Sequence, residues 1–95
     1  MNQETRLKRI SYRAWHRGTR EADMMIGGFF DRYGAELDED GLKLFERLLE
    51  EQDVDIMAWA MGMQITPPEY QGEMMEIMRR LDYVELPNRE GFAKL

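Results

Sequence analysis

The densest group of potential metal ligands in the sequence is a run of four carboxylates between Glu36 and Gly41. Its spacing resembles the start of a calcium-binding loop, with acids at the first, third and fifth positions and glycine at the sixth. Such a loop needs a glutamate at position twelve that binds the cation through both oxygens, and this position is Arg47. Because an arginine removes two ligands and repels calcium, the acidic run is expected to cap and charge a helix start. No metal site is predicted.

Side chains that serve as nucleophiles, acids or bases are few. His16 is the only histidine and Ser11 the only serine, and no acid is placed by the sequence to orient the imidazole. His16 is better explained by a position near a helix C-terminus, where it interacts favourably with the helix dipole. The acids between positions 50 and 55 are typical of helix caps and solvated charges. No catalytic residue is predicted.

Arg17, Gly18 and Glu21 form the segment of greatest functional interest. Their spacing fits a purely structural role: an arginine in a last helical turn, a glycine at the C-terminal cap and a glutamate in the next first turn. It equally fits a recognition role. Two opposite charges on a short corner, with a glycine between them, would let a partner protein approach closely. The spacing alone does not decide between these interpretations.

The elements that must position this segment belong to a small globular chain. With 95 residues, 43% apolar and 34% charged, the sequence predicts one soluble domain with little room for a deep pocket. No apolar run approaches the roughly 18 residues of a membrane-spanning helix, so no membrane insertion is expected. The absence of cysteine excludes disulfides and thiolate chemistry and fits a reducing compartment.

Charge is distributed unevenly along the chain. Residues 1–20 carry six basic side chains and one acid, whereas residues 21–95 carry seven basic and 18 acidic ones, within a net charge of −6. We therefore expect a molecule with two electrically different faces, which steers an oriented encounter with a partner protein. The acidic remainder repels phosphate, so nucleic acid is not an expected partner.

Apolar spacing of three and four residues indicates an all-α fold: a compact bundle of about five short helices in a single domain, residues 1–95. The core is expected over about 5–82, and the tail over about 83–95 is expected to be irregular. Helices are predicted over about 5–16, from a cap at Thr19, from Asp38 or Asp40, from Asp53 or Asp55 to Gly62, and from Thr66.

Two short motifs and the number of methionines give further structural predictions. Gly27-Gly28 inside the second helix predicts a kink or an early end there. Thr66-Pro67-Pro68-Glu69 combines a capping residue, an early proline and a third-position glutamate, which predicts the start of the fifth helix. Most of the nine methionines are expected in the core. A surplus among Met24, Met25, Met61, Met63 and Met75 favours a protein-binding surface.

Two segments resemble a known family. The run from Arg17 through Asp23, followed by Phe29-Phe30, resembles the RGxxE signature of the small flavinylation factors of succinate dehydrogenase, the SdhE type. The run from Leu48 to Gly62 resembles the same family's stretch with two leucines, two aspartates spaced by one residue, a tryptophan and a glycine. Thr19 stands where the family often has methionine, and Gly28 where proline is common.

The resemblance implies an assembly factor that binds the flavoprotein subunit of succinate dehydrogenase, and in some members that of fumarate reductase. It implies that the partner's own histidine attacks the methyl carbon of FAD, so this chain would be a chaperone and not an enzyme. Arg17, Gly18, Glu21 and Asp23 would bind the partner. FAD would belong to the partner, with no cofactor held tightly here. A free monomer is expected, in a bacterial cytoplasm in preference to a mitochondrial matrix.

Two other classes of function stay open. A helical regulatory or protein-binding module would use the basic first helix. A direct flavin transferase would need a contact with FAD on the first or second helix, although no phosphate-binding glycine loop precedes either of them.

Overall fold

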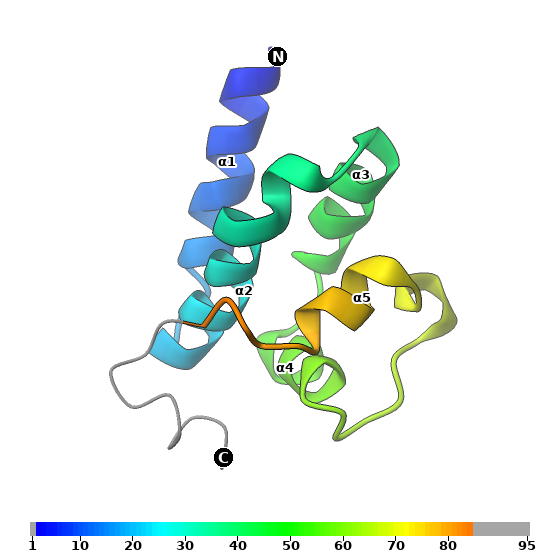
Figure 1. The fold of residues 1–95 in the computed structure, drawn as a ribbon. Helices are drawn as coiled ribbons and strands as arrows, with labels where there is room; N and C mark the ends of the chain where they lie inside the picture. Colours follow the sequence, from blue (N-terminus) through cyan, green and yellow to red (C-terminus); the bar gives the residue numbers. More distant parts are fainter. Residues whose placement is uncertain (1, 85–95) are drawn as a thin grey trace.

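The computed structural model describes residues 2–84, which form a compact set of five α-helices and two short 3-10 turns without a strand (Figure 1). The all-α prediction is confirmed. Within the described residues no helix is long and apolar enough to cross a membrane. In chain order the elements are α1 (Gln3–Trp15), α2 (Arg20–Tyr33), η1 (Gly34–Glu36), α3 (Glu39–Leu48), α4 (Asp53–Ala60), η2 (Pro68–Tyr70) and α5 (Glu73–Met78).

A single core joins all five helices. At its centre the Phe45 ring lies 5.2 Å from Phe30 and 5.6 Å from Phe29, and Tyr83 meets Phe29 edge-on at 5.6 Å. Tyr83 and Val84 are both buried, so burial continues for two residues beyond the predicted core boundary at 82. The rest of the predicted tail lies outside the described residues.

Side-chain caps start two helices where the sequence predicts them. The Thr19 hydroxyl accepts a hydrogen bond from the backbone N–H of Ala22 at 3.2 Å, and an Asp38 carboxylate oxygen accepts one from Gly41 at 2.8 Å. Each cap satisfies a backbone donor that has no partner within the helix. Asp38, taken from the acidic run, therefore serves the start of α3.

The prediction of an early end at Gly27-Gly28 is wrong, because α2 continues to Tyr33. The glycines allow other parts of the chain to approach closely. The Trp15 indole lies over Gly27, where an added Cβ would overlap the ring, and its Nε1 donates to Asp31 at 3.2 Å. A Cβ at Gly28 would come within 3.3 Å of the Tyr83 carbonyl oxygen. Packing of Trp15 and Tyr83 outweighs the helix-propensity cost of the two glycines.

The predicted start of the fifth helix at Thr66 is also wrong. The prolines open only η2, and α5 begins at Glu73. Thr66 is 1% exposed, and its hydroxyl accepts a hydrogen bond from Arg79 at 2.5 Å in place of capping a helix. A tertiary contact therefore takes the side chain that the local pattern assigned to a cap.

Asp53, one of the two residues predicted to cap the fourth helix, is instead its first helical residue. The N-cap is Gln52, which makes no side-chain hydrogen bond. The Asp53 carboxylate contacts Arg17, which precedes α2.

Two arginines of α1 pair with acids of α3 and of the turn that follows it. Arg6 contacts Glu39 at 2.8 Å and Glu46 at 2.7 Å, and further down the helix Arg13 contacts Glu50 at 3.1 Å. The Arg6 guanidinium lowers the pKa of the Glu39 carboxyl through their hydrogen bond. Basic side chains of residues 1–20 thus form ion pairs with acids from the rest of the chain. These pairs reduce the expected difference in charge between two faces of the molecule.

Candidate functional site

The candidate site is the corner between α1 and α2, where the chain reverses over Arg17, Gly18 and Thr19. Gly18 has φ +120°, a backbone conformation that side-chain-bearing residues rarely adopt, so the sharp turn depends on glycine. Just before it, Nδ1 of His16 donates to the Tyr12 carbonyl oxygen at 2.7 Å, and the two rings stack 3.9 Å apart. His16 thus closes the end of α1, as its predicted position required.

Arg17 fastens this corner to the start of α4. Its Nε donates to Asp53 at 2.7 Å, and its Nη2 donates to the Glu51 carbonyl oxygen at 3.1 Å. The Arg17 side chain is only 11% exposed and that of Asp53 24%, so the ion pair is largely shielded from water. Its charges therefore attract more strongly than those of a fully solvated pair.

Asp23 supports the same corner from α2. Its carboxylate accepts a hydrogen bond from the Arg17 backbone N–H at 2.6 Å, across the turn. Two of the four predicted partner-binding residues, Arg17 and Asp23, are thus engaged within the chain. Their observed work is to hold the corner in one conformation.

Glu51 links the corner to η2. While its carbonyl accepts from Arg17, its carboxylate accepts from the Tyr70 hydroxyl at 2.8 Å. Burial, reinforced by the hydrogen bond to Glu51, raises the pKa of Tyr70 to about 12. The Tyr70 ring stacks on Trp59 of α4 at 5.6 Å. The corner therefore rests on a connected set of side chains that extends into the core.

Sequence reasoning missed Asp53, Glu51 and Tyr70 as parts of this site. Asp53 was taken for a helix cap, because a pattern along the chain cannot reveal a partner 36 positions away. One signal was available: Asp53 and Glu51 lie inside the second of the two stretches that carry the family resemblance.

Gly18 and Glu21 remain available at the surface. Both are exposed, and a Cβ added at Gly18 would meet nothing within 4 Å. Among the described residues the Glu21 carboxylate makes no hydrogen bond or ion pair. The corner thus presents a free carboxylate beside an open stretch of backbone, which is the arrangement that the recognition interpretation requires.

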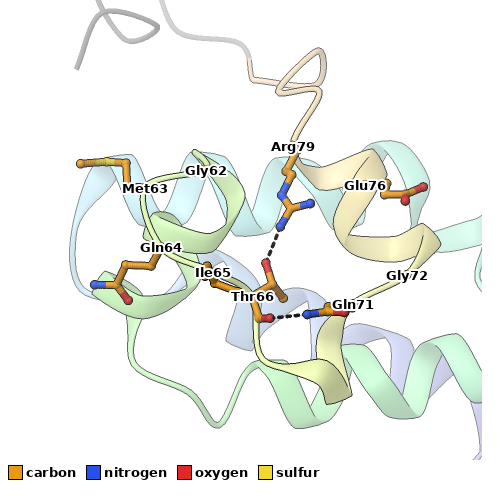
Figure 2. A pocket seen from close by; sticks show the side chains of 9 residues that line it. All are labelled: Gly62, Met63, Gln64, Ile65, Thr66, Gln71, Gly72, Glu76 and Arg79. Carbon is orange, nitrogen blue, oxygen red and sulfur yellow. Dashed lines mark hydrogen bonds between the residues drawn. The ribbon is translucent and has the colours of Figure 1, made fainter.

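Residues 2–84 contain no group of three His, Cys, Asp or Glu side chains that would hold a metal ion. A hollow of about 480 Å³ lies beyond the far end of α4, lined by residues 62–66 together with Glu76 and Arg79 (Figure 2). Arg79 already donates to Thr66 and to the Trp59 carbonyl oxygen. With Glu76 alongside, the lining is poorly suited to the phosphates of a dinucleotide.

Comparison with known proteins places these features in a family. A family model described as the flavinator of succinate dehydrogenase matches residues 8–82. The FAD assembly factor SdhE of Acetobacter pasteurianus is 34% identical over 77 residues, which cover 81% of this chain and 71% of that protein. The mitochondrial succinate dehydrogenase assembly factor 2 of Danio rerio is 36% identical over 74 residues, covering 76% of this chain and 47% of the relative.

The corresponding protein of Drosophila grimshawi is 32% identical over 77 residues, covering 79% of this chain and 52% of the relative. The chain thus spans about half the length of the mitochondrial relatives that it matches. The matched residues contain the whole corner, its anchor at Asp53 and all of α5. The chain belongs to the family of flavinators of succinate dehydrogenase.

Proposed function

We propose that this chain is an assembly factor that binds the flavoprotein subunit of succinate dehydrogenase and promotes its covalent flavinylation with FAD. Family membership supports this function, as do relatives named FAD assembly factor and succinate dehydrogenase assembly factor. Fumarate reductase is a second flavoprotein partner within the proposal. The proposed setting is a free monomer in a bacterial cytoplasm, and both bacterial and mitochondrial relatives match the chain.

The observation that carries the proposal is the ion pair between Arg17 and Asp53. It joins the two stretches of sequence that resemble the family, although 36 positions separate them. The result is a rigid corner on which Gly18 and Glu21 face outward. We assign Arg17 and Asp23 to positioning, and Gly18 and Glu21 to direct contact with the flavoprotein.

In this proposal the chain performs no bond-making step, and FAD is bound by the partner. The factor accelerates the reaction by binding one conformation of the flavoprotein more tightly than the others. Holding reacting groups in the productive arrangement is worth several orders of magnitude in rate. A rigid corner suits this task because little conformational entropy is lost when it docks.

The basic-helix alternative receives no support from the ion pairs of α1 and of the corner that follows it. Arg6, Arg13 and Arg17 all contact carboxylates of the same chain. Nucleic-acid phosphates would have to displace these acids, so no salt-sensitive DNA binding is expected. The absence of any gel shift at low salt would agree with this expectation.

Glu21→Gln tests the proposed contact. The amide keeps the shape of the side chain and removes its charge, so the fold should persist while flavoprotein binding weakens. Glu73→Gln is a matched control, because Glu73 is also an exposed first-turn glutamate, on α5. The measurement is in-gel fluorescence of covalent flavin on the flavoprotein, from cells lacking this gene and supplied with each variant. Full restoration by Glu21→Gln would contradict the assignment of Glu21, and normal flavinylation without the gene would contradict the function.

Gly18→Ala tests the open backbone beside Glu21. Alanine is strained at φ +120°, at a cost of about 1–3 kcal/mol, so a control with equal strain is needed. Gly72→Ala provides it, since Gly72 has φ +139° and equally open space around its Cα. We expect both variants to lose similar stability and only Gly18→Ala to lose flavinylation. Equal flavinylation by the two variants would show that Gly18 serves the fold alone.

A further inference from the structure

Helix α4 is apolar on two opposite faces. Ile56, Trp59 and Ala60 point into the core and are buried. At 3.6 residues per turn, the opposite side of the helix carries Val54, Met57, Ala58 and Met61. Val54 is 67% exposed, and the other three are partly exposed. Met57 and Met61 pack partly against the core, whereas Val54 stays largely exposed on this side of α4.

The turn after α4 carries two more exposed apolar side chains. Met63 is 69% exposed and Ile65 is 90% exposed. Met63, Ile65 and Val54 are three of the four large apolar side chains exposed in the described part of the chain. We call Val54, Ala58, Met61, Met63 and Ile65 the apolar edge.

The turn that carries Met63 and Ile65 is held firmly. The backbone N–H of Met63 donates to the Ala58 carbonyl oxygen at 2.8 Å, and Gly62 adopts φ +74° to permit this closure. On the far side, Arg79 and Gln71 both donate to Thr66, the next residue after Ile65 (Figure 2). The exposed side chains therefore stand on a fixed backbone. Such preorganisation reduces the entropy lost on binding.

We infer that the apolar edge is a second contact surface for the same flavoprotein, beside the corner, an inference that rests on the proposed function. Asp53, the anchor of Arg17, begins α4, and the turn with Met63 and Ile65 ends it. Eight helical residues span only about 12 Å, so one partner surface reaches both features.

Size and charge favour this occupant over a second copy of the chain. Only three large apolar side chains of the edge are well exposed, whereas each partner in a standard stable interface buries roughly 800 Å² over 20–30 residues. The edge fits as the extension of a larger interface that includes the corner. A symmetric pair would also bring together two molecules of net charge −6, with acidic residues such as Asp55 and Glu76 near the contact. The partner surface should be apolar with a basic rim.

The test is the affinity of the purified chain for the purified flavoprotein subunit, measured by biolayer interferometry with a Met63→Ser/Ile65→Ser double variant. Because both side chains are exposed, the urea midpoint should stay at the wild-type value. Losing two buried aliphatic contacts should weaken binding about tenfold or more. Gln64→Ala, an exposed polar position in the same turn, should bind like the wild type.

The outcomes separate this inference from the proposed function. Wild-type affinity in the double variant, together with weakened binding by Glu21→Gln, would overturn the inference and leave the function standing. Failure of the wild-type chain to bind the flavoprotein would overturn both. Sedimentation velocity tests whether a second copy of the chain binds the edge instead. If the wild-type chain is a dimer, the double variant is a monomer and flavoprotein affinity is unchanged, the edge is a self-association surface and the inference is overturned.

Discussion

The Arg17–Asp53 ion pair provides the sharpest test of how the corner works. Arg17→Met keeps the length of the buried aliphatic stem and removes the guanidinium, whereas Asp53→Ala removes the carboxylate. The two side chains are 11% and 24% exposed, so the pair lies between a solvated surface bridge, worth about 0–1 kcal/mol, and a fully buried one. A hydrogen bond to a charged group is worth about 1.5–3 kcal/mol. We therefore expect each variant to lose about 2 kcal/mol of unfolding free energy.

Asp55→Ala is the control for the helix dipole. Asp55 lies in the same first turn of α4, and its side chain makes no hydrogen bond or ion pair with any residue that the structure describes. Its removal should cost no more than about 1 kcal/mol. For a domain of this size, about 2 kcal/mol corresponds to a fall in Tm of about 8–16 °C. Asp53→Ala should therefore melt well below Asp55→Ala in a calorimetric scan.

A double-mutant cycle then decides whether Arg17 acts through Asp53. If the pair is the unit that holds the corner, the stability changes of Arg17→Met and Asp53→Ala are not additive, with a coupling energy of about 1–2 kcal/mol. Flavinylation by the two single variants and by the double variant should fall to the same level. Full activity of Asp53→Ala with lost activity of Arg17→Met would refute this reasoning, because Arg17 would then act on the partner directly. A coupling energy of zero would refute the energetic argument.

Two further predictions concern the support of the corner. Gly27→Ala should lose about 1–3 kcal/mol in urea unfolding, because the new Cβ overlaps the Trp15 indole, while Gly28→Ala should be milder since its neighbour stays 3.3 Å away; equal effects would contradict the packing explanation. Tyr70→Phe should flatten the alkaline limb of the stability curve. The folded-state pKa of Tyr70, about 12, lies above the ordinary value of 10, so the contribution is present below pH 10 and is lost between pH 10 and 12. The wild-type chain should therefore lose about 2 kcal/mol more than Tyr70→Phe across that range, and parallel curves would contradict the assignment.

Local chemistry was readable wherever neighbours in the chain decide the outcome. Thr19 and Asp38 cap the helices that follow them, since a short polar side chain reaches an N–H three residues ahead. His16 lies at the end of α1 for a similarly local reason. The same kind of reasoning failed at Thr66, where an arginine thirteen positions away takes the hydroxyl.

The methionine surplus was also only partly readable. Met25 and Met75 are fully buried, whereas Met63 is 69% exposed. Composition indicated that some methionines would be exposed on a binding surface, and only the packing of α4 and its following turn showed which ones. The outer face of α4 was invisible in the sequence because both sides of that helix are apolar.

By itself, the sequence determined the helical class, the approximate positions of most helices and the Arg17 to Glu21 segment as the candidate site. These follow from periodicity, caps and the resemblance of two short stretches, all of which are local along the chain. The tertiary structure alone decided that Arg17 reaches Asp53 and that Gly18 and Glu21 stay free. The physical reason is that burial and ion pairing join residues far apart in sequence. A carboxylate therefore becomes an anchor or a free contact according to which segment folds against it.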